Sequence, residues 1–463
     1  MQERMNGIGF SPAGYSPVIP SSSCFPKKLR VQPQRALSSD PYVLELAETL
    51  EDSFPSSPST PLPLQNLRLS SSQSLLSTPW PSRRDEPFRF TDLSFIRQSR
   101  ILPVSPTISL LTPTSHLPND VYVGSLSSSS PSLLQRVSHF ICPFPIGDLF
   151  FSINGIAAPD LTLVYVPEGC HVDIPIHLDY MLPPTPSTDD SDAAMHLSNP
   201  RVLVVVEKGA HVNIIEDFPA SPENQNDSYW SNAAFEAVIG QGAKLTHSYI
   251  QTQSFRAAHI KWTSIRQEAS STYELTEVST GGKLGRHNLH IQQLGPDTVT
   301  ELSTLHLSVA DQTQDLHSTL VLDHPRGYSR QLHKCIVTHS QGQAVFDGNI
   351  KVNSSVPLLC RYAQQTDAGQ LTRTLLLEPR ATVNVKPNLQ IVADDVKCSH
   401  GAAISDLEES QLLYFQARGI DIETARRVLV FAFGSEVIDK FPYSSIRDRV
   451  RSQIKNLLDP SSN

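Results

Sequence analysis

The sequence predicts a mainly β protein whose central part, from about residue 150 to about residue 400, winds as a β-solenoid. This region consists of short alternating apolar runs rich in Val, Ile, Leu and Thr, with almost no helical period between them. Several runs repeat one unit of strand, corner and strand, with a glycine or a small residue in the corner. The corners are Gly169-Cys170-His171, Gly209-Ala210-His211, Gly242-Ala243-Lys244 and Arg380-Ala381-Thr382. Because glycine adopts positive φ at no steric cost, such corners favour stacked coils that each bury an inward face against the next.

A pair of packed β-sandwich sheets is the second interpretation of the same strands. Sandwich strands are joined by tight hairpins, for which Asn-Gly is a strong signal. Between residues 150 and 400 this dipeptide occurs once, at Asn154-Gly155. The solenoid is therefore the favoured prediction.

Residues 1–39 differ in composition from the rest of the chain. They contain one acid and five bases, together with seven serines and five prolines, and no apolar core of a secretory signal. A basic, Ser-rich and acid-poor leader is typical of an organellar transit peptide. The alternative is a disordered tail without a targeting role.

Helices are predicted at both ends of the β region. Near the N-terminus, residues 40–52 place Val43, Ala47 and Leu50 on one helical face, with Asp40 as the N-cap.

After the β region, a helix is predicted to begin with Ser405 and Glu408 in capping-box spacing and to stop at Gly419. A second helix is expected from Asp421 to about Gly434.

A third, basic helix follows Pro442 and carries an apolar stripe at Ile446, Val450, Ile454 and Leu457. Helices added to a β-solenoid are compatible with a docking module or with a cap on the solenoid end, and both interpretations stay open.

Composition excludes several classes of protein. The chain has 463 residues and a formal net charge of -9, which argues against a nucleic-acid footprint. Its six cysteines are scattered without a CxxC pair, so a reducing compartment fits better than a disulfide framework. The longest apolar run, Val428 to Phe433, is far shorter than the roughly 20 residues that span a bilayer.

Cys398 and His400 form the most suggestive pair of potential ligands. Two residues apart on a strand, they face the same side, with their backbones roughly 7 Å apart. The alternation of apolar residues slips at Asp394-Asp395, as it does at a corner or bulge. Two ligands do not close a metal site, so the pair is either structural or part of a larger set.

The remaining histidines give weaker signals. His287 and His290 are three residues apart, which puts them on opposite faces of a strand. Stacked coils are able to bring His324, His333 and His339 together, although packed or surface histidines are the favoured interpretation. No GxxxxGK[ST], GxSxG or HExxH motif is present, which argues against an autonomous enzyme.

Five blocks of the sequence are distinctive. They are "PWPSRRDEPFRFTDLS" (79–94), "STGGKLGRHNLH" (279–290), "FDGNIKV" (346–352), "TLLLEPRATVNVKPNL" (374–389) and "NLQIVADDVKCSHGAAISDLEESQLLYFQARGI" (388–420). Together they resemble the SufD subunit of the SUF iron–sulfur cluster assembly complex, SufBCD, in its plant chloroplast form. The resemblance covers about residues 40 to 458. This chain differs from the sister subunit SufB, which carries His-Glu-Ala where this chain has Cys398 to Ala402, and a cysteine at the position of Ile391.

The resemblance implies a right-handed parallel β-helix core at residues 116–404, after a transit peptide at residues 1–39 and an N-terminal helical region at residues 40–115. It also implies a C-terminal helical domain, residues 405–463, that docks the SufC-type ATPase. The protein is then a non-catalytic scaffold subunit in the chloroplast stroma, paired with a SufB-type subunit through the β-helices.

The resemblance further implies that no cofactor is bound permanently and that a transient iron–sulfur cluster is held at the SufB–SufD interface. His400 matches the histidine that is the candidate metal ligand on the SufD side, and Cys398 is its neighbour in the motif. Neutral imidazole and thiolate groups from two chains are able to complete a ligand set that neither chain holds alone.

One segment departs from the family pattern. Residues Ser354 to Cys360 lengthen a link between two blocks, either as a loop between coils or as a splice or gene-model variant. Cys360 does not match a family position.

Two other function classes stay open. A β-helix carbohydrate-active enzyme would need an exposed cluster of Asp, Arg or Lys along stacked coils. A structural interaction protein would pair with partners and make no contact with a cluster.

Overall fold

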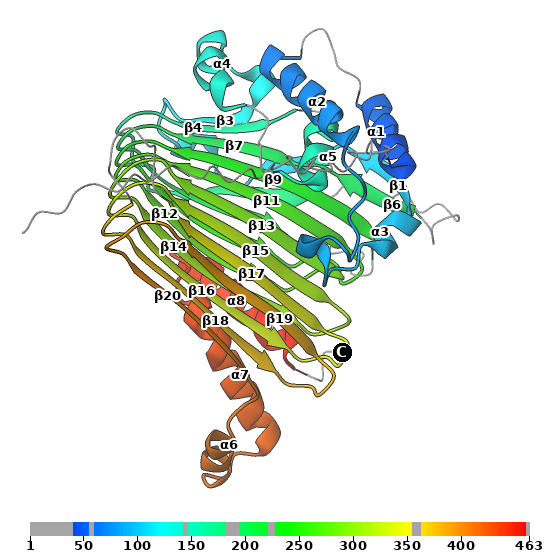
Figure 1. The fold of residues 1–463 in the computed structure, drawn as a ribbon, viewed down its shortest axis with the longest axis vertical. Coiled ribbons are helices and arrows are strands. Elements are labelled where there is room, and N and C mark those ends of the chain that lie inside the picture. Colours follow the sequence, from blue (N-terminus) through cyan, green and yellow to red (C-terminus); the bar gives the residue numbers. More distant parts are fainter. Residues whose placement is uncertain are drawn as a thin grey trace, which may run out of the picture. The chain divides into compact units, whose positions relative to one another are not determined.

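Two large sheets wound from one chain form the body of the protein, and helices lie at both ends (Figure 1). The computed structural model describes residues 40–54, 60–141, 147–158, 160–181, 194–220, 227–353 and 363–459. All of them belong to one unit, Ser39–Asn463. The predicted transit peptide at residues 1–39 and the added segment at residues 354–360 lie outside the described residues.

The first sheet, here called sheet A, has 11 strands. They are β1 (Arg100–Val104), β3 (Tyr122–Ser125), β4 (Thr162–Val166), β6 (Ala194–Ser198), β7 (Arg201–Val206), β9 (Tyr229–Ile239), β11 (Ala258–Gln267), β13 (Leu284–Gln293), β15 (Thr313–Leu322), β17 (Gln343–Val352) and β19 (Thr382–Ile391).

The second sheet, sheet B, has nine strands. They are β2 (Thr107–Leu110), β5 (Ile176–Met181), β8 (His211–Phe218), β10 (Lys244–Gln251), β12 (Thr272–Ser279), β14 (Val299–Ser308), β16 (Tyr328–Val337), β18 (Asp367–Leu376) and β20 (Lys397–Ser405).

From β7 onward the chain alternates between the sheets, so that one strand of each makes one coil of a solenoid. Neighbouring coils pair in parallel, for example β16 with β18 and β18 with β20. Antiparallel pairing occurs in the first coils, between β2 and β5 and between β3 and β4. The predicted parallel β-helix with helices at both ends is confirmed, and the β-sandwich alternative is wrong because sandwich sheets are antiparallel.

The corners from sheet A to sheet B form a column of residues with positive φ. The predicted corners at Gly169, Gly209 and Gly242 belong to this column. The N–H of each of these three glycines bonds to a carbonyl of the next coil, as Gly209 N bonds to Gln241 O at 2.9 Å. Later coils keep the conformation without glycine, at Ser270, Asp297, Arg326, Gln365 and Asp395.

Two sequence predictions about corners have different outcomes. The slip at Asp394-Asp395 is confirmed as a corner, since Asp395 has φ of 54° between β19 and β20. The equivalence of Arg380-Ala381 with the three glycine corners is wrong. That segment turns from β18 of sheet B back to β19 of sheet A, and so lies at the opposite corner.

The N-terminal helices cover the outer face of the first coils of sheet A (Figure 1). Helix α1 begins after Asp40, whose side chain accepts the N–H of Tyr42 at 3.0 Å as predicted. Its buried face packs with Phe150 and Trp230. The helices of this region are α1 (Pro41–Ser53), α2 (Leu62–Leu75), α3 (Ser94–Gln98), α4 (Pro131–Val137) and α5 (Leu149–Ala157), with 3₁₀ turns η1 (Glu86–Phe88), η2 (Thr114–His116), η3 (Leu126–Ser128) and η4 (Ser138–Phe140).

The expected boundary at residue 115 does not separate the helices from the strands. Strands β1 and β2 precede that residue, whereas α4 and α5 follow it. The reason is that the antiparallel and short strands of the first coils are built from the same segment as the covering helices.

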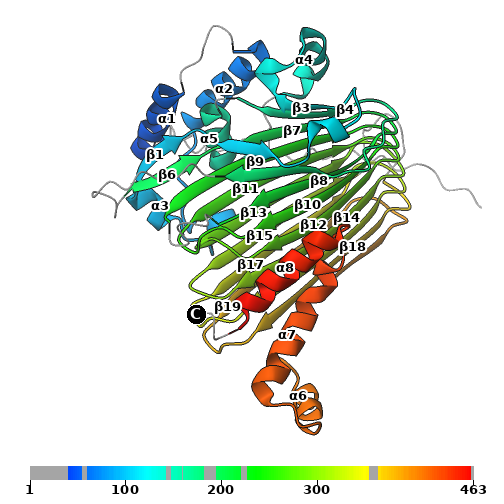
Figure 2. The same cartoon turned by 180° about the vertical axis from the view of Figure 1, so that it is seen from behind.

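At the C-terminus, α7 (Ile422–Ile438) and α8 (Ser444–Leu457) pack on the outer face of sheet B (Figure 2). The predicted stripe of α8 is confirmed, with Ile446, Val450 and Ile454 buried. Asp421 caps α7 by accepting the N–H of Thr424 at 2.9 Å.

In this region, the predicted start of one helix and the predicted end of another are wrong. Helix α6 (Glu409–Gln416) begins after Glu408, because Ser405 is still paired in β20 and is not free to cap a helix. Helix α7 continues through Gly434, where the missing side chain lets the helix approach sheet B. A Cβ there would lie 3.1 Å from Leu305 Cδ2. Among the described residues, no helix is both long and apolar enough to cross a membrane.

Candidate functional site

The last coil of the solenoid, β19 and β20 with the corner between them, is here called the terminal coil. Both strands are the last in their sheets, so each leaves one edge without a paired strand among the described residues. Ile391, Val392 and Ile404 are exposed on this coil. An uncovered coil presents unpaired backbone groups and apolar side chains together, which is the property of a strand-pairing surface.

Cys398 and His400 lie on the inward face of β20. In the parallel register, Cys398 pairs with Ala368, a core residue, and His400 pairs with Gln370, which is buried. The two residues therefore continue the columns that fill the interior of earlier coils. Cys398 packs against the core and is half-buried, whereas His400 is exposed because no further coil covers it.

Burial raises the pKa of Cys398, although a backbone hydrogen bond involving Ala368 acts in the opposite direction. Cysteine binds metals in its deprotonated form, so a metal ion bound by this thiol would release a proton.

Within the described ranges, no group of three or more His, Cys, Asp or Glu side chains is placed to hold a metal ion. Cys398 and His400 are therefore two potential ligands, fewer than a closed metal site requires. The other described cysteines, Cys170 and Cys335, are free and belong to other coils. Cys24, Cys142 and Cys360 lie outside the described residues.

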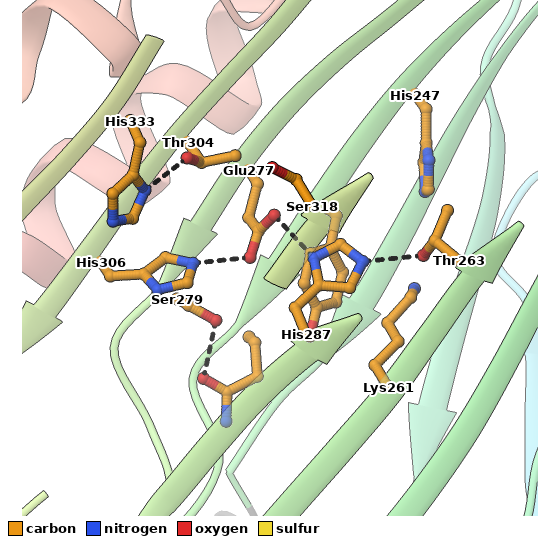
Figure 3. Close-up of polar contacts among 12 residues, drawn as sticks. His247, Lys261, Thr263, Glu277, Ser279, His287, Thr304, His306, Ser318 and His333 are labelled. Atoms are coloured by element: carbon orange, nitrogen blue, oxygen red, sulfur yellow. Dashed lines mark hydrogen bonds and ion pairs between the residues drawn. The ribbon is translucent and has the colours of Figure 1, made fainter. Parts of the chain in front are cut away.

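The interior of the middle coils contains a second set of polar groups, here called the interior network (Figure 3). Its centre is Glu277, whose carboxylate lies 2.8 Å from His287 Nδ1 and 2.8 Å from His306 Nε2. A carboxylate only accepts hydrogen bonds, so both of these ring nitrogens donate. The network consists of Glu216, His247, Lys261, Thr263, Glu277, His287, Thr304, His306 and His333.

The two carboxylates of the interior network are held in the charged form. Burial acts to raise the pKa of Glu277, but His287 and His306 outweigh it and hold that pKa well below its usual range. For Glu216, Lys261 and His247 likewise overcome burial and lower the pKa to about 2.

Two other histidines of the network, His247 and His333, are held in the neutral form. Burial lowers the pKa of His247, and burial together with His306 lowers the pKa of His333 well below its usual range. His333 donates or accepts toward Thr304 Oγ1 at 2.7 Å and stacks on Phe346. The carboxylates of the network are thus paired inside the solenoid with histidine or lysine.

Sequence reasoning found only part of this arrangement. His287 and His290 are on opposite faces as predicted, because His287 bonds Glu277 inside and His290 lines a cavity outside. His324, His333 and His339 are not brought together. His324 and His339 lie in opposite corners of the coils, whereas His333 lies on β16 inside.

A cluster of charged residues also lies on the outer face of sheet A, beside a cavity of about 350 Å³. Arg286 pairs with Asp315 at 2.5 Å and donates to Pro87 O at 2.9 Å. Thr91 donates to Asp315 at 2.7 Å. These contacts fasten the segment around residues 86–91 to the sheet. Asp315 is paired with a cation, and this is not the arrangement of a free acid and base that glycoside hydrolysis requires.

Helix α6 projects beyond the sheets, together with the start of α7 (Figures 1 and 2). Leu412 is its buried residue, whereas the side chains of Leu413 and Tyr414 are 62% and 56% exposed. An exposed apolar face on a projecting helix is typical of a protein-binding surface.

Comparison with known proteins gives a consistent result. Residues 188–433 match the family model of the SufBD core domain of the SUF system for iron–sulfur cluster assembly. Over 92% of this chain and 92% of the relative, the sequence is 58% identical to "Protein ABCI7, chloroplastic" of Arabidopsis thaliana. It is 34% identical to a SufBD-family iron–sulfur cluster assembly protein of Synechocystis, covering 84% of this chain and 90% of that one. It is 26% identical to the iron–sulfur cluster assembly protein SufD of Escherichia coli, covering 82% and 90% of the two chains.

Proposed function

Because this chain belongs to the SufBD family of the SUF iron–sulfur cluster assembly system, we propose that it is a non-catalytic, SufD-type scaffold subunit. It pairs with a SufB-type subunit through the terminal coil and binds a SufC-type ATPase through its C-terminal helices. A nascent iron–sulfur cluster is the cargo held between the two solenoid subunits.

The observation that carries this proposal is the position of Cys398 and His400. They occupy the inward face of the terminal coil, beside two sheet edges without partner strands among the described residues. A second parallel solenoid placed end to end would extend both sheets and bring its own side chains to the same inward columns. His400 then supplies an imidazole nitrogen and Cys398 a thiolate to a cluster that is completed from the partner.

The proposal is tested by assembly on the purified complex. The chain is co-expressed with SufB-type and SufC-type subunits of the same source and reconstituted anaerobically with iron and sulfide. His400→Ala should reduce the iron and sulfide retained per complex while the three subunits still co-purify, and Cys398→Ala should have a smaller effect. Lys397→Ala, an exposed residue of the same strand, is the matched control. Equal cluster content in the His400→Ala and control complexes would overturn the site assignment.

The surface proposed for the ATPase is tested separately. Leu413→Asp combined with Tyr414→Asp places two charges on the exposed face of α6 and should release the ATPase subunit while the SufB-type subunit stays bound. Leu69→Asp is the control, because Leu69 is an equally exposed leucine on α2 at the other end. Loss of the ATPase from both variants would argue against a specific role of α6.

We also propose that the protein works in the chloroplast, in the stroma. The composition of residues 1–39 and the chloroplastic name of the Arabidopsis relative support this location. In an import assay with isolated chloroplasts, the full chain should become protected from added protease, whereas a chain that starts at residue 40 should not. Import of both chains would contradict a transit role of residues 1–39.

A further inference from the structure

The inward column that ends at His400 contains two glutamines in the preceding coils. His400 on β20 pairs with Gln370 on β18, and Gln370 pairs with Gln331 on β16. Both glutamines are 3% exposed. Their side chains therefore lie inside the solenoid, directly behind the histidine of the terminal coil.

Hydrogen bonds fix the direction of these two amides. Gln331 Nε2 donates to Ser318 Oγ on the facing sheet at 2.9 Å, and Gln370 Nε2 donates to Gln331 Oε1 at 2.9 Å. Gly348 of sheet A provides the room, since a Cβ there would lie 2.3 Å from Gln370 Nε2. Because its nitrogen is engaged with Gln331, Gln370 presents its oxygen to the remaining neighbours.

That oxygen, Gln370 Oε1, is buried and has no hydrogen-bond partner among the described residues. A buried carbonyl oxygen without a donor is costly, by about 1–3 kcal/mol. The next residue of the same column is His400, whose imidazole carries an N–H donor. The facing residue of the terminal coil, Pro387, pairs with Gly348 and has no backbone N–H to offer.

We propose that Gln370 is a positioning residue for His400, with Gln370 Oε1 accepting the N–H of one ring nitrogen of that histidine. The hydrogen bond selects one tautomer and orients the ring. The other nitrogen keeps its lone pair and faces out of the open terminal coil. Histidines that bind metals are commonly held in this way by an acceptor behind the ring.

The consequence for metal binding rests on the proposed function, whereas the tautomer of His400 is measurable in the full chain alone. Long-range ¹H–¹⁵N spectra of histidine-labelled protein report the tautomer of each ring. The signal of His400 is identified by its absence from His400→Ala.

In the wild-type chain, His400 should be in one tautomer in large excess. Gln370→Met removes the acceptor at nearly constant length and should change the tautomer ratio roughly five-fold, the equivalent of one typical hydrogen bond. Thr372→Val is the matched control, because Thr372 is a buried polar residue of the same strand whose column ends at Ala402.

A Gln370→Met chain with the wild-type tautomer ratio would overturn the inference, and so would an equal change in Thr372→Val. If Gln370→Met does not fold, Gly348→Ala provides the second variant. Its added Cβ displaces the amide of Gln370 without removing it, and the same change in the tautomer ratio is expected. An unchanged ratio in folded Gly348→Ala would equally contradict the inference.

Different results would contradict the cluster site at His400 and the contact between Gln370 and His400. If His400→Ala assembles clusters normally while Gln370→Met shifts the tautomer, the cluster site is wrong and the positioning contact stands. If His400→Ala loses clusters but Gln370→Met leaves the tautomer unchanged, the positioning contact is wrong and the cluster site stands.

Discussion

The inward face of the solenoid contains histidines and acids or thiols in two places, in the middle coils and in the terminal coil. In the middle coils, Glu277 is enclosed and bonded by His287 and His306. In the terminal coil, Cys398 and His400 occupy equivalent inward positions with one side uncovered. Residues of the same chemical types are therefore structural in one place and available to a ligand in the other.

This difference teaches that coverage by the next coil decides the role of an inward residue. A covered charged residue has to find its counter-charge within the chain, because an unpaired buried charge is very costly. An uncovered residue keeps hydrogen-bonding groups and lone pairs free to bind another molecule. Four measurements test whether the inward residues of the middle coils are structural and those of the terminal coil are not.

Removal of the central carboxylate should give the largest effect. Glu277→Gln leaves two buried imidazoles without the charge that pairs with them, and we expect a loss of about 3–5 kcal/mol in the free energy of unfolding. Denaturant unfolding followed by circular dichroism measures it. Glu301→Gln, on the exposed outer face of the adjacent strand β14, should cost less than about 0.5 kcal/mol. Similar losses in both variants would show that the interior network does not hold the middle coils together.

Cys335 and Cys398, both on the inward face of sheet B, should differ in their reaction with an alkylating reagent. Cys335 is 1% exposed and burial raises its pKa to about 12, so it should react only when the chain unfolds. Cys398 is half-buried at the open end and should react on the order of 100-fold faster at pH 8. Mass spectrometry of the labelled peptides gives both rates. Equal rates would mean that the terminal coil is covered or that the middle coils open readily.

A covered histidine should also make stability depend on pH. Burial, with a smaller contribution from Lys261, lowers the pKa of His259 to about 3, whereas the unfolded chain takes up this proton near pH 6.5. The stabilising effect of the neutral ring is complete above about pH 6.5 and is lost as the pH falls toward 3.

His259→Phe should therefore reduce the slope of stability against pH by about 1.4 kcal/mol per pH unit between pH 4.5 and 6. Denaturant unfolding at a series of pH values measures this slope. His116→Phe is the control, since His116 is exposed in a 3₁₀ turn. An unchanged slope in His259→Phe would contradict the neutral buried ring.

The smallest effect is expected at the terminal coil itself. His400→Ala removes an exposed side chain and should change the free energy of unfolding of the isolated chain by less than about 0.5 kcal/mol. The same unfolding measurement checks it. A loss as large as that of Glu277→Gln would place His400 with the structural residues.

The sequence predicts the class of fold because strands and corners leave local signals. Gly169, Gly209 and Gly242 mark corners that need positive φ, and three corners were enough to indicate a solenoid. The later corners gave no such signal, since Arg326 and Gln365 adopt the same conformation without being glycine. Hydrogen bonds to the next coil hold them there, and those bonds depend on stacking that no local pattern records.

The interior network could not be predicted for a related reason. Strand alternation assigns His287 and His290 to opposite faces, and Leu289 and Ile291 mark the face of His287 as the inner one. The alternation does not say which residue His287 bonds there. The pairing of Glu277 with His306 also spans 29 residues and depends on the register of β12 and β14. Cys398 and His400 were found from their spacing on one strand, and the family resemblance implied a role for them. The structure adds their position on the terminal coil.

The two edges of the terminal coil differ in a way that matters for the chain on its own. Pro387 removes one N–H from the edge of β19, and Lys386 adds a charge beside it. Strand β20 contains no proline and runs through Gly401 and Ala402. An edge of this kind pairs readily with further copies of itself. We therefore expect isolated chains to aggregate through β20 or to be removed by proteases, and we expect the proposed pairing with a SufB-type subunit to prevent both.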